Sequence, residues 1–293
     1  MFSRSYRISP LRGVSVCLLA FLIASCAAAT ARAQIDFYRF FKTDNYQQTS
    51  DAQPTVAESF VGNVDILFDD GLNLTPAQVS STSPLSPMPL GLVAPGNLRF
   101  SQLYASAAAR DVDFPAGTSY DYQVTDGPVG PVDAVLNVPV KDLFAPQVPY
   151  FTGTTYDQLQ GLNPTNDFTL PFNGYATPDG INTPLIFIGI NRVSDGQSVY
   201  GNSGPSTSTS FTIPGNTLEP GTQYDVSLVY SARIDTARAG FGGATSEVGF
   251  DLHTDLIFTT AVPEPATWLL AVMGGAGFLG WRQRSGCGSQ RHG

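Results

Sequence analysis

The sequence predicts an all-β fold of two tandem β-sandwich modules, flanked by an N-terminal signal peptide and a short hydrophobic helix near the C-terminus. Residues 35–261 contain many short runs rich in β-branched and aromatic residues, often alternating in polarity, and turns rich in Gly, Pro, Asn and Asp separate them. A second observation is a short motif that occurs twice in the chain. The pattern Gly-Thr-x-Tyr-Asp occurs at 117–121 and again at 221–225, an offset of 221 − 117 = 104 residues. This offset is close to the length of one sandwich domain of about 100 residues, so two modules are expected.

The composition and the charge distribution restrict the function classes. Of 293 residues, 13% are charged and 42% are hydrophobic, which is typical of a globular chain. Residues 34–265 hold 8 of the 15 basic residues and all 24 acidic residues, so their formal net charge is 8 − 24 = −16. A body this acidic repels phosphate backbones and anionic lipid head groups, so nucleic-acid binding is not expected. Cys17, Cys26 and Cys287 all lie outside this body, which must therefore be stabilised by packing without disulfides.

Residues 1–33 have the order of a secretory signal peptide. Three arginines precede an apolar run, and the small residues Ala31 and Ala33 then form a small-x-small cleavage site. We therefore expect export and cleavage after Ala33. Two alternatives stay open. Residues 23–26, Ile-Ala-Ser-Cys, resemble a bacterial lipoprotein box in which Cys26 becomes the lipidated N-terminus, or the whole segment is retained as a membrane helix.

The first module is expected at 34–145 and the second at 146–261. Strand patterns occur at 64–69, 119–124 and 133–140 in the first module, and at 167–172, 184–190, 208–213, 224–232 and 255–260 in the second. Residues 104–111 are expected to form either a short helix or a strand and turn, and 155–162 a helical turn. Two prolines stiffen the predicted linker at 140–153. A single larger sandwich is the alternative to two small ones.

Residues 218–232, LEPGTQYDVSLVYSA, resemble the fibronectin type III pattern around its tyrosine corner. The second module is therefore similar to fibronectin type III and immunoglobulin-like domains. The resemblance implies that a Pro-Gly turn leads into a strand and that the Tyr224 hydroxyl bonds back to the preceding backbone. Tyr120, in the first copy of the repeated motif, is expected to take the cognate place. Both tyrosines are interpreted as scaffold residues.

The body offers little catalytic or metal-binding chemistry. Its one histidine, His253, is expected on the solvent face of a strand, because no further histidine or cysteine completes a zinc site. Asp65, Asp69 and Asp70 gather near one turn and are weak candidates for Ca²⁺, but they lack EF-hand spacing, and Asp-Asp-Gly is also ordinary turn chemistry. No Gly-x-Ser-x-Gly elbow occurs. We therefore expect no catalytic residue, no metal and no cofactor, with Ca²⁺ as the remaining candidate.

Residues 262–293 combine three different features in order. Pro263-Glu264-Pro265 forms a stiff extended peptide, since proline restricts both its own backbone and the residue before it. Residues 266–281 are apolar and uncharged. Sixteen helical residues span about 24 Å, which is short of a bilayer core of about 30 Å, so the segment is a marginal anchor. Arg282 and Arg284 then hold the C-terminal end on the inner side of the membrane.

This order, with VPEPATW at 262–268, resembles the PEP-CTERM sorting signal over about 25 residues. The resemblance implies recognition by an exosortase, a membrane-embedded cysteine transpeptidase-like enzyme, after transient insertion into the inner membrane. It also implies removal of the tail and delivery to the cell surface or the exopolysaccharide matrix. Pro263-Glu264-Pro265 matches the recognition motif, and Arg282 and Arg284 match the basic end. The family often stops near its arginines, whereas SGCGSQRHG follows here.

The sequence thus predicts a non-enzymatic exported protein of the bacterial surface or extracellular matrix, processed by an exosortase and associated with exopolysaccharide. One alternative is a carbohydrate-binding module protein, in which exposed tyrosines stack on sugar rings. A further alternative is a secreted glycan-active hydrolase, which needs two carboxylates about 5–10 Å apart.

Overall fold

The computed structural model describes residues 35–68, 77–124, 132–237 and 244–262, and it confirms the all-β prediction. Strands dominate, and the two helices within these ranges are short. The strands are β1 (Ile35–Gln47), β2 (Ser59–Phe68), β3 (Ala77–Ser80), β4 (Met88–Pro89), β5 (Gly91–Ala94), β6 (Asn97–Tyr104), β7 (Ser119–Val124), β8 (Val132–Asn137), β9 (Phe168–Pro171), β10 (Thr183–Arg192), β11 (Ser198–Pro205), β12 (Ser210–Ile213), β13 (Gln223–Ala237) and β14 (Thr245–Thr259). The helices are α2 (Ala107–Asp113) and α3 (Thr155–Leu159).

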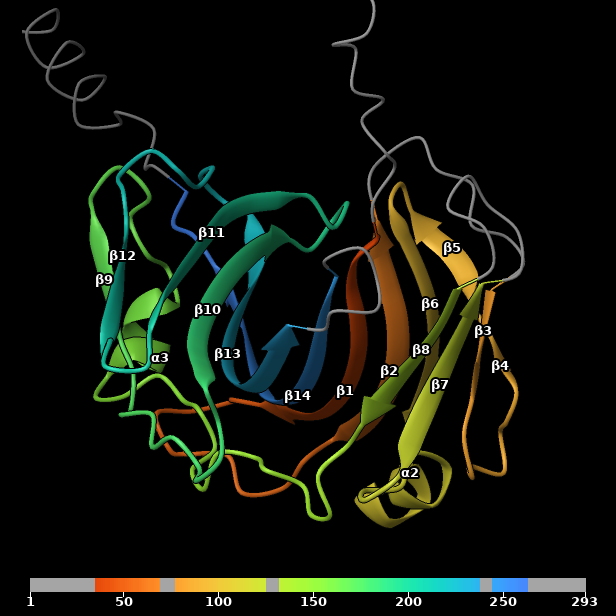
Figure 1. Cartoon of the computed structure of the whole chain (residues 1–293). Helices are drawn as coiled ribbons and strands as arrows, with labels where there is room; N and C mark the ends of the chain where they lie inside the picture. The colour runs from red at the N-terminus through yellow and green to blue at the C-terminus, as the bar shows by residue number, and fades with distance from the viewer. Residues whose placement is uncertain (1–34, 69–76, 125–131, 238–243, 263–293) are drawn as a thin grey trace, which may run out of the picture.

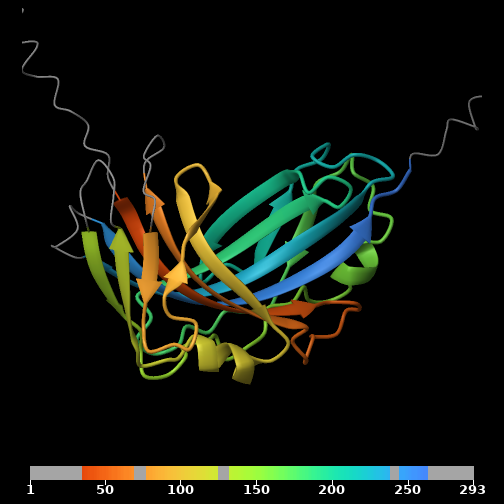
Figure 2. The ribbon, with the colours of Figure 1, turned by 90° about the vertical axis from the view of Figure 1, so that its right-hand side faces the viewer.

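One eight-stranded sheet runs through both halves of the chain (Figure 1). Its order is β11-β10-β13-β14-β1-β2-β6-β5, and β1 and β14 are its one parallel pair. The four-stranded sheet β4-β3-β7-β8 flanks one half of this large sheet, and the two-stranded sheet β12-β9 flanks the other. Because β1 and β14 run parallel, the start of β1 and the end of β14 lie at opposite ends of the molecule (Figure 2).

Two hydrophobic cores lie along the same face of the large sheet. In β14, side chains of alternate residues point to one face, as strand geometry requires. Val248 and Phe250 join the first core, under the four-stranded sheet, whereas Leu252 and Phe258 join the second core, near β9 and β12. A fully buried side chain of this size stabilises the fold by about 1.5–3 kcal/mol. One long strand therefore contributes to both cores.

The large sheet crosses the predicted boundary between residues 145 and 146. β1 belongs to the predicted first module and β14 to the second, yet they pair in register from Phe37↔Thr245 to Gln47↔Asp255. The predicted linker 140–153 is packed as well, since Leu143 lies in the first core and Phe151 in the second. Each small sheet is built from one half of the chain, whereas the large sheet is built from both. That each half is an independent domain stays a prediction.

Both predicted helical segments contain a helix. α2 overlaps the stretch 104–111, where a short helix or a strand and turn was expected, and extends two residues beyond it. Ser106 explains its start, because its hydroxyl accepts a hydrogen bond from the Ala109 N–H at 3.2 Å, which is the usual way to satisfy a free donor in the first turn. α3 forms the expected turn in the second half.

The repeated Gly-Thr-x-Tyr-Asp pattern has a similar turn in both places, but the two tyrosine hydroxyls make different hydrogen bonds. Gly117 and Gly221 adopt φ values of 68° and 64°, a region that favours glycine. The Tyr224 hydroxyl accepts a hydrogen bond from the Glu219 N–H at 2.8 Å, five residues upstream, which confirms the predicted tyrosine corner. Tyr120 also reaches back five residues, where its hydroxyl donates to the carbonyl of Pro115 at 3.4 Å.

The predicted signal peptide and the predicted tail helix lie outside the described residues. Within the described ranges, neither helix is long and apolar enough to cross a membrane.

Candidate functional site

Most of the site residues predicted from the sequence lie outside the residues that the structure describes. Those outside the described residues are Ala31, Ala33, Cys26, Asp69, Asp70, Pro263, Glu264, Pro265, Arg282 and Arg284. Asp65 is described, and its carboxylate is buried between two guanidinium groups: Arg39 Nε at 2.6 Å and Arg99 Nη2 at 2.9 Å. The negative charge of Asp65 is therefore already neutralised, so Asp65 is not a Ca²⁺ ligand in this structure, contrary to its place among the weak candidates. Across the described ranges, His, Cys, Asp and Glu form no group of three that could hold a metal ion.

His253 lies on β14 between Asp251 and Asp255, on the face that points away from the cores. Its neighbour Leu252 is buried in the second core, so His253 points to the opposite face of the sheet, where it is half-buried rather than fully exposed. A catalytic dyad would require a hydrogen bond between the His253 ring and one of these two carboxylates. Asp251 instead accepts a hydrogen bond from the Ser231 hydroxyl at 2.5 Å, and Asp255 accepts one from Ser227.

The face opposite the cores carries a network of charges that sequence reasoning missed. Arg233 pairs with Glu247 at 2.7 Å, and both Arg233 and Arg39 stack on the ring of Phe41, at 5.3 and 5.4 Å from its centroid. Phe41 lies flat over Gly249, where an added Cβ would come within 2.0 Å of the ring. Gly249 was the signal in the sequence that could have indicated this contact, because a glycine inside a strand often marks a place where another group comes close to the backbone.

The pKa of Glu247 shows how strongly this face is buried. Burial raises the pKa of its carboxyl to about 6, and the charges of Arg233 and Arg39 oppose the shift. The guanidinium groups pair with carboxylates of the same face, so the network stabilises the sheet rather than offering free charges to a ligand.

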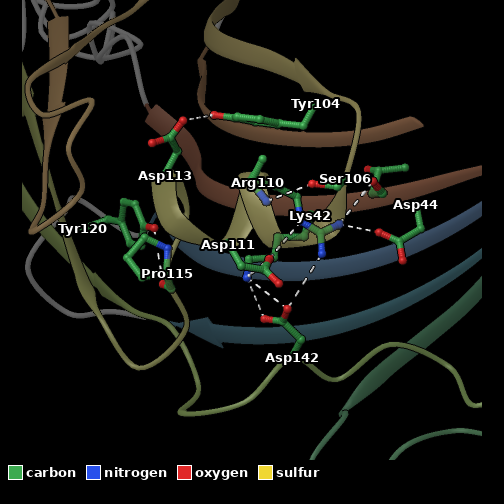
Figure 3. A network of polar contacts seen from close by, with 12 residues as sticks. Lys42, Asp44, Tyr104, Ser106, Arg110, Asp111, Asp113, Pro115, Tyr120 and Asp142 are labelled. Atoms are coloured by element: carbon green, nitrogen blue, oxygen red, sulfur yellow. Dashed lines mark hydrogen bonds and ion pairs between the residues drawn. The ribbon is translucent and has the colours of Figure 1, made fainter. Parts of the chain in front are cut away.

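A second ionic cluster lies between β1, α2 and the segment that follows β8 (Figure 3). Lys42 is fully buried, and its Nζ lies 2.8 Å from Asp111 and 2.9 Å from Asp142. Arg110 is 1% exposed and pairs with Asp44 and, at 3.0 Å, with Asp111. Every cation here has a carboxylate partner, which is the condition under which charges are tolerated in an interior.

The pKa values of two carboxyl groups in this cluster, Asp44 and Asp111, are shifted in opposite directions. For Asp44, burial raises the pKa despite the charge and hydrogen bond of Arg110. For Asp111, burial acts in the same upward direction, but the hydrogen bond from Lys42 and the charge of Arg110 lower the pKa overall. The cluster ties β1 to α2 and to Asp142 in the segment after β8, so its ion pairs lie within the first half of the chain.

The aromatic side chains contribute to the cores rather than to a surface platform. Each described tyrosine is buried or half-buried, and the exposed large hydrophobic side chains of the described ranges are aliphatic. The stacking surface expected for sugar rings on exposed tyrosines therefore has no counterpart there.

The remaining candidate is the place where the chain leaves the fold. Thr260 is 3% exposed, and its hydroxyl donates to the Glu219 carbonyl at 2.6 Å. Ala261 is held on both sides: its N–H donates to the Leu162 carbonyl at 2.8 Å, and its carbonyl accepts from the Gly221 N–H at 3.1 Å. Val262 is 71% exposed. Among the described residues, backbone hydrogen bonds to the fold therefore end at Ala261, two residues before Pro263.

An open hollow of about 340 Å³ lies beside this exit. Its lining carries no charged side chain and consists of Val193, Ser194, Gly221, Thr222 and Gln223. At its border, Arg192 pairs with Asp195 at 3.0 Å and with Glu219 at 2.6 Å, so the nearest charges are paired. The exit of the chain and an uncharged hollow thus share one end of the molecule, which we call the exit tip.

Residues 261–285 match the family described as the PEP-CTERM protein-sorting motif. No curated protein matches the chain significantly. Among solved structures, a segment of two fibronectin type III domains from chicken tenascin is 14% identical and covers 68% of this chain and 92% of its own, with a TM-score of 0.23. The FN1–FN3 domains of chicken CNTN1 are 10% identical and cover 79% of this chain and 67% of their own, with a TM-score of 0.25. At these identities and scores, the likeness says nothing about binding or activity.

Proposed function

We propose that this chain is the precursor of a non-enzymatic surface or matrix protein, whose acidic β-sheet body is exported and then sorted through the tail. The single observation that carries the proposal is the sorting motif at 261–285, which implies an exported protein recognised by an exosortase. The signal-peptide pattern at 1–33 supports it, because export must precede sorting. In this proposal Pro263-Glu264-Pro265 is recognised, Arg282 and Arg284 keep the tail end inside, and the body is released or attached outside.

The body itself supports a structural role. The buried ionic groups of the Lys42 cluster and those around Phe41 are engaged with one another, whereas the cleavage of a substrate would need a carboxylate or nucleophile aimed at open space. The proposed partner outside the cell is exopolysaccharide. A body with a formal net charge of −16 between residues 34 and 265 suits a hydrated matrix, in which net charge keeps proteins soluble.

The test is the intact mass of the chain in each fraction of a host that makes it. We expect a species that begins at Gln34 and has lost the tail, recovered from the surface or the matrix. Replacing Pro263-Glu264-Pro265 by three alanines should leave the precursor in the inner membrane. Normal maturation of this variant would contradict the proposal, and a mature N-terminus at lipidated Cys26 would replace the predicted cleavage after Ala33.

A further inference from the structure

The exit tip lies within a short, bounded distance of the sorting motif. Ala261 is the last of the described residues with backbone hydrogen bonds to the fold, and Glu264 follows three positions later in the sequence. An extended chain advances at most about 3.6 Å per residue, so Glu264 lies within about 11 Å of Ala261. This bound holds for any conformation of the residues between them.

Moving the motif farther away would require the end of β14 to separate from the fold. That would break both backbone hydrogen bonds of Ala261 and expose Thr260, whose hydroxyl donates to Glu219 and accepts from the Thr222 N–H at 3.0 Å. It would leave the Glu219 carbonyl and the Thr222 amide without these partners, which is unfavourable. An enzyme that holds the motif therefore approaches the exit tip while the body is folded.

The chemistry of the exit tip suits such an approach. The acidic body repels an anionic lipid surface, but the hollow is uncharged and Arg192 balances its two nearest carboxylates in part. Val193 at the rim is 45% exposed, and Val262 is 71% exposed and packs over Gly221. Exposed aliphatic side chains around an uncharged depression are features of contact surfaces.

We propose that the exit tip is the surface against which the membrane-embedded sorting enzyme docks while it holds the motif. This inference rests on the proposed function and extends it, because it makes the folded body part of what the enzyme recognises. The occupant follows from the short length of chain between Ala261 and the motif, because an enzyme that holds the motif must lie next to the exit tip.

The experiment compares rates of conversion from precursor to mature protein by pulse–chase in the native host. Val193→Lys places a charge at the exit tip and should slow conversion at least about fivefold, the size of effect seen when a central interface contact is lost. The matched control is Val135→Lys, because Val135 has nearly the same exposure, 43%, but lies on β8 in the other half. This control should mature at the wild-type rate.

A spacer variant separates docking from folding. Eight Gly and Ser residues inserted between Val262 and Pro263 add a flexible reach of about 16 Å, so the enzyme can hold the motif without touching the exit tip. In this background Val193→Lys should mature as fast as the spacer variant alone. Equal slowing with and without the spacer, or a wild-type rate for Val193→Lys, overturns the docking proposal.

The triple-alanine motif variant, measured alongside, distinguishes the two proposals. If it stays unprocessed while Val193→Lys matures normally, the sorting function stands and docking at the exit tip falls. If the triple-alanine variant matures normally, both fall.

Discussion

At the scale of single residues, Tyr224 and Tyr120 hold equivalent places but make hydrogen bonds of different quality. The Tyr224 hydroxyl satisfies the Glu219 N–H at 2.8 Å, whereas Tyr120 makes a longer contact of 3.4 Å to a carbonyl. Tyr224→Phe should cost about 1–3 kcal/mol of unfolding free energy, because it leaves a backbone donor without this partner. Tyr120→Phe should cost less than about 1 kcal/mol, since the contact that it removes is long. Urea denaturation of both variants measures the difference, and equal losses would contradict it.

Lys42 is the most constrained cation of the ionic cluster in Figure 3. Lys42→Met removes one of the two cationic partners of Asp111 and Asp142 and leaves Arg110 alone between these carboxylates, so we expect a loss of about 2–4 kcal/mol. The control is Lys141→Met, since Lys141 is the neighbouring exposed lysine and surface changes usually stay within about 0.5 kcal/mol. Thermal melting followed by circular dichroism tests both, and similar melting temperatures for the two variants would refute the assignment.

Asp225 makes the stability depend on pH. Burial, and then the charge of Asp255, raises the pKa of Asp225 from 3.8 to about 6. The folded state therefore binds this proton more tightly than the unfolded chain, so its contribution to stability is present below pH 3.8 and is lost as pH rises toward about 6. Asp225→Asn should match the wild type near pH 4 and exceed it by about 1–2 kcal/mol at pH 7, a figure reduced for partial exposure.

Urea midpoints at several pH values between 4 and 7 check this expectation. The informative quantity is the difference between Asp225→Asn and the wild type at each pH. A difference that stays constant across the range would show that the effect of the substitution is unrelated to ionisation.

At the scale of elements, the contact of β1 with β14 depends on a glycine. Phe41 occupies the space that a side chain at 249 would take. Gly249→Ala should therefore cost about 1–3 kcal/mol through overpacking. Gly189→Ala on β10, which meets no atom within 4 Å, should be neutral or slightly stabilising. If the denaturant midpoints of the two variants agree, Phe41 does not hold the described position.

At the scale of the whole molecule, the shared sheet predicts cooperative unfolding. β1 and β14 pair over eleven registered positions across the predicted module boundary, so neither half can unfold without breaking this ladder. We expect one urea transition, with tyrosine fluorescence and far-ultraviolet circular dichroism coinciding. Leu228→Ala in the second core should shift this single transition as a whole. Two separate transitions would instead support two independent modules at 34–145 and 146–261.

Much of this molecule could be predicted because the relevant signals are local. Alternating polarity indicated the strands, the Ser106 cap lies beside a helix-forming stretch, and the Gly-Thr-Gln-Tyr-Asp copy at 221–225 carries the turn and the tyrosine corner within a few residues. The sorting motif at 261–285 is local as well, because Pro263-Glu264-Pro265, an apolar run and the arginines follow one another along the chain. The export signal, the strand content and the sorting motif could therefore be predicted from the sequence alone.

Only the tertiary structure decided how the two halves are joined and where the tail leaves. The parallel pairing of β1 with β14 brings together residues about 200 positions apart, as in Arg39↔Glu247, and nothing in the local pattern specifies that register. The Lys42 cluster and the anchoring of Ala261 by Leu162 likewise depend on partners far away in the chain. Strand propensity depends on a few neighbouring residues. Strand register, ion pairs and burial depend instead on how the whole chain packs, because their partners are distant in the sequence.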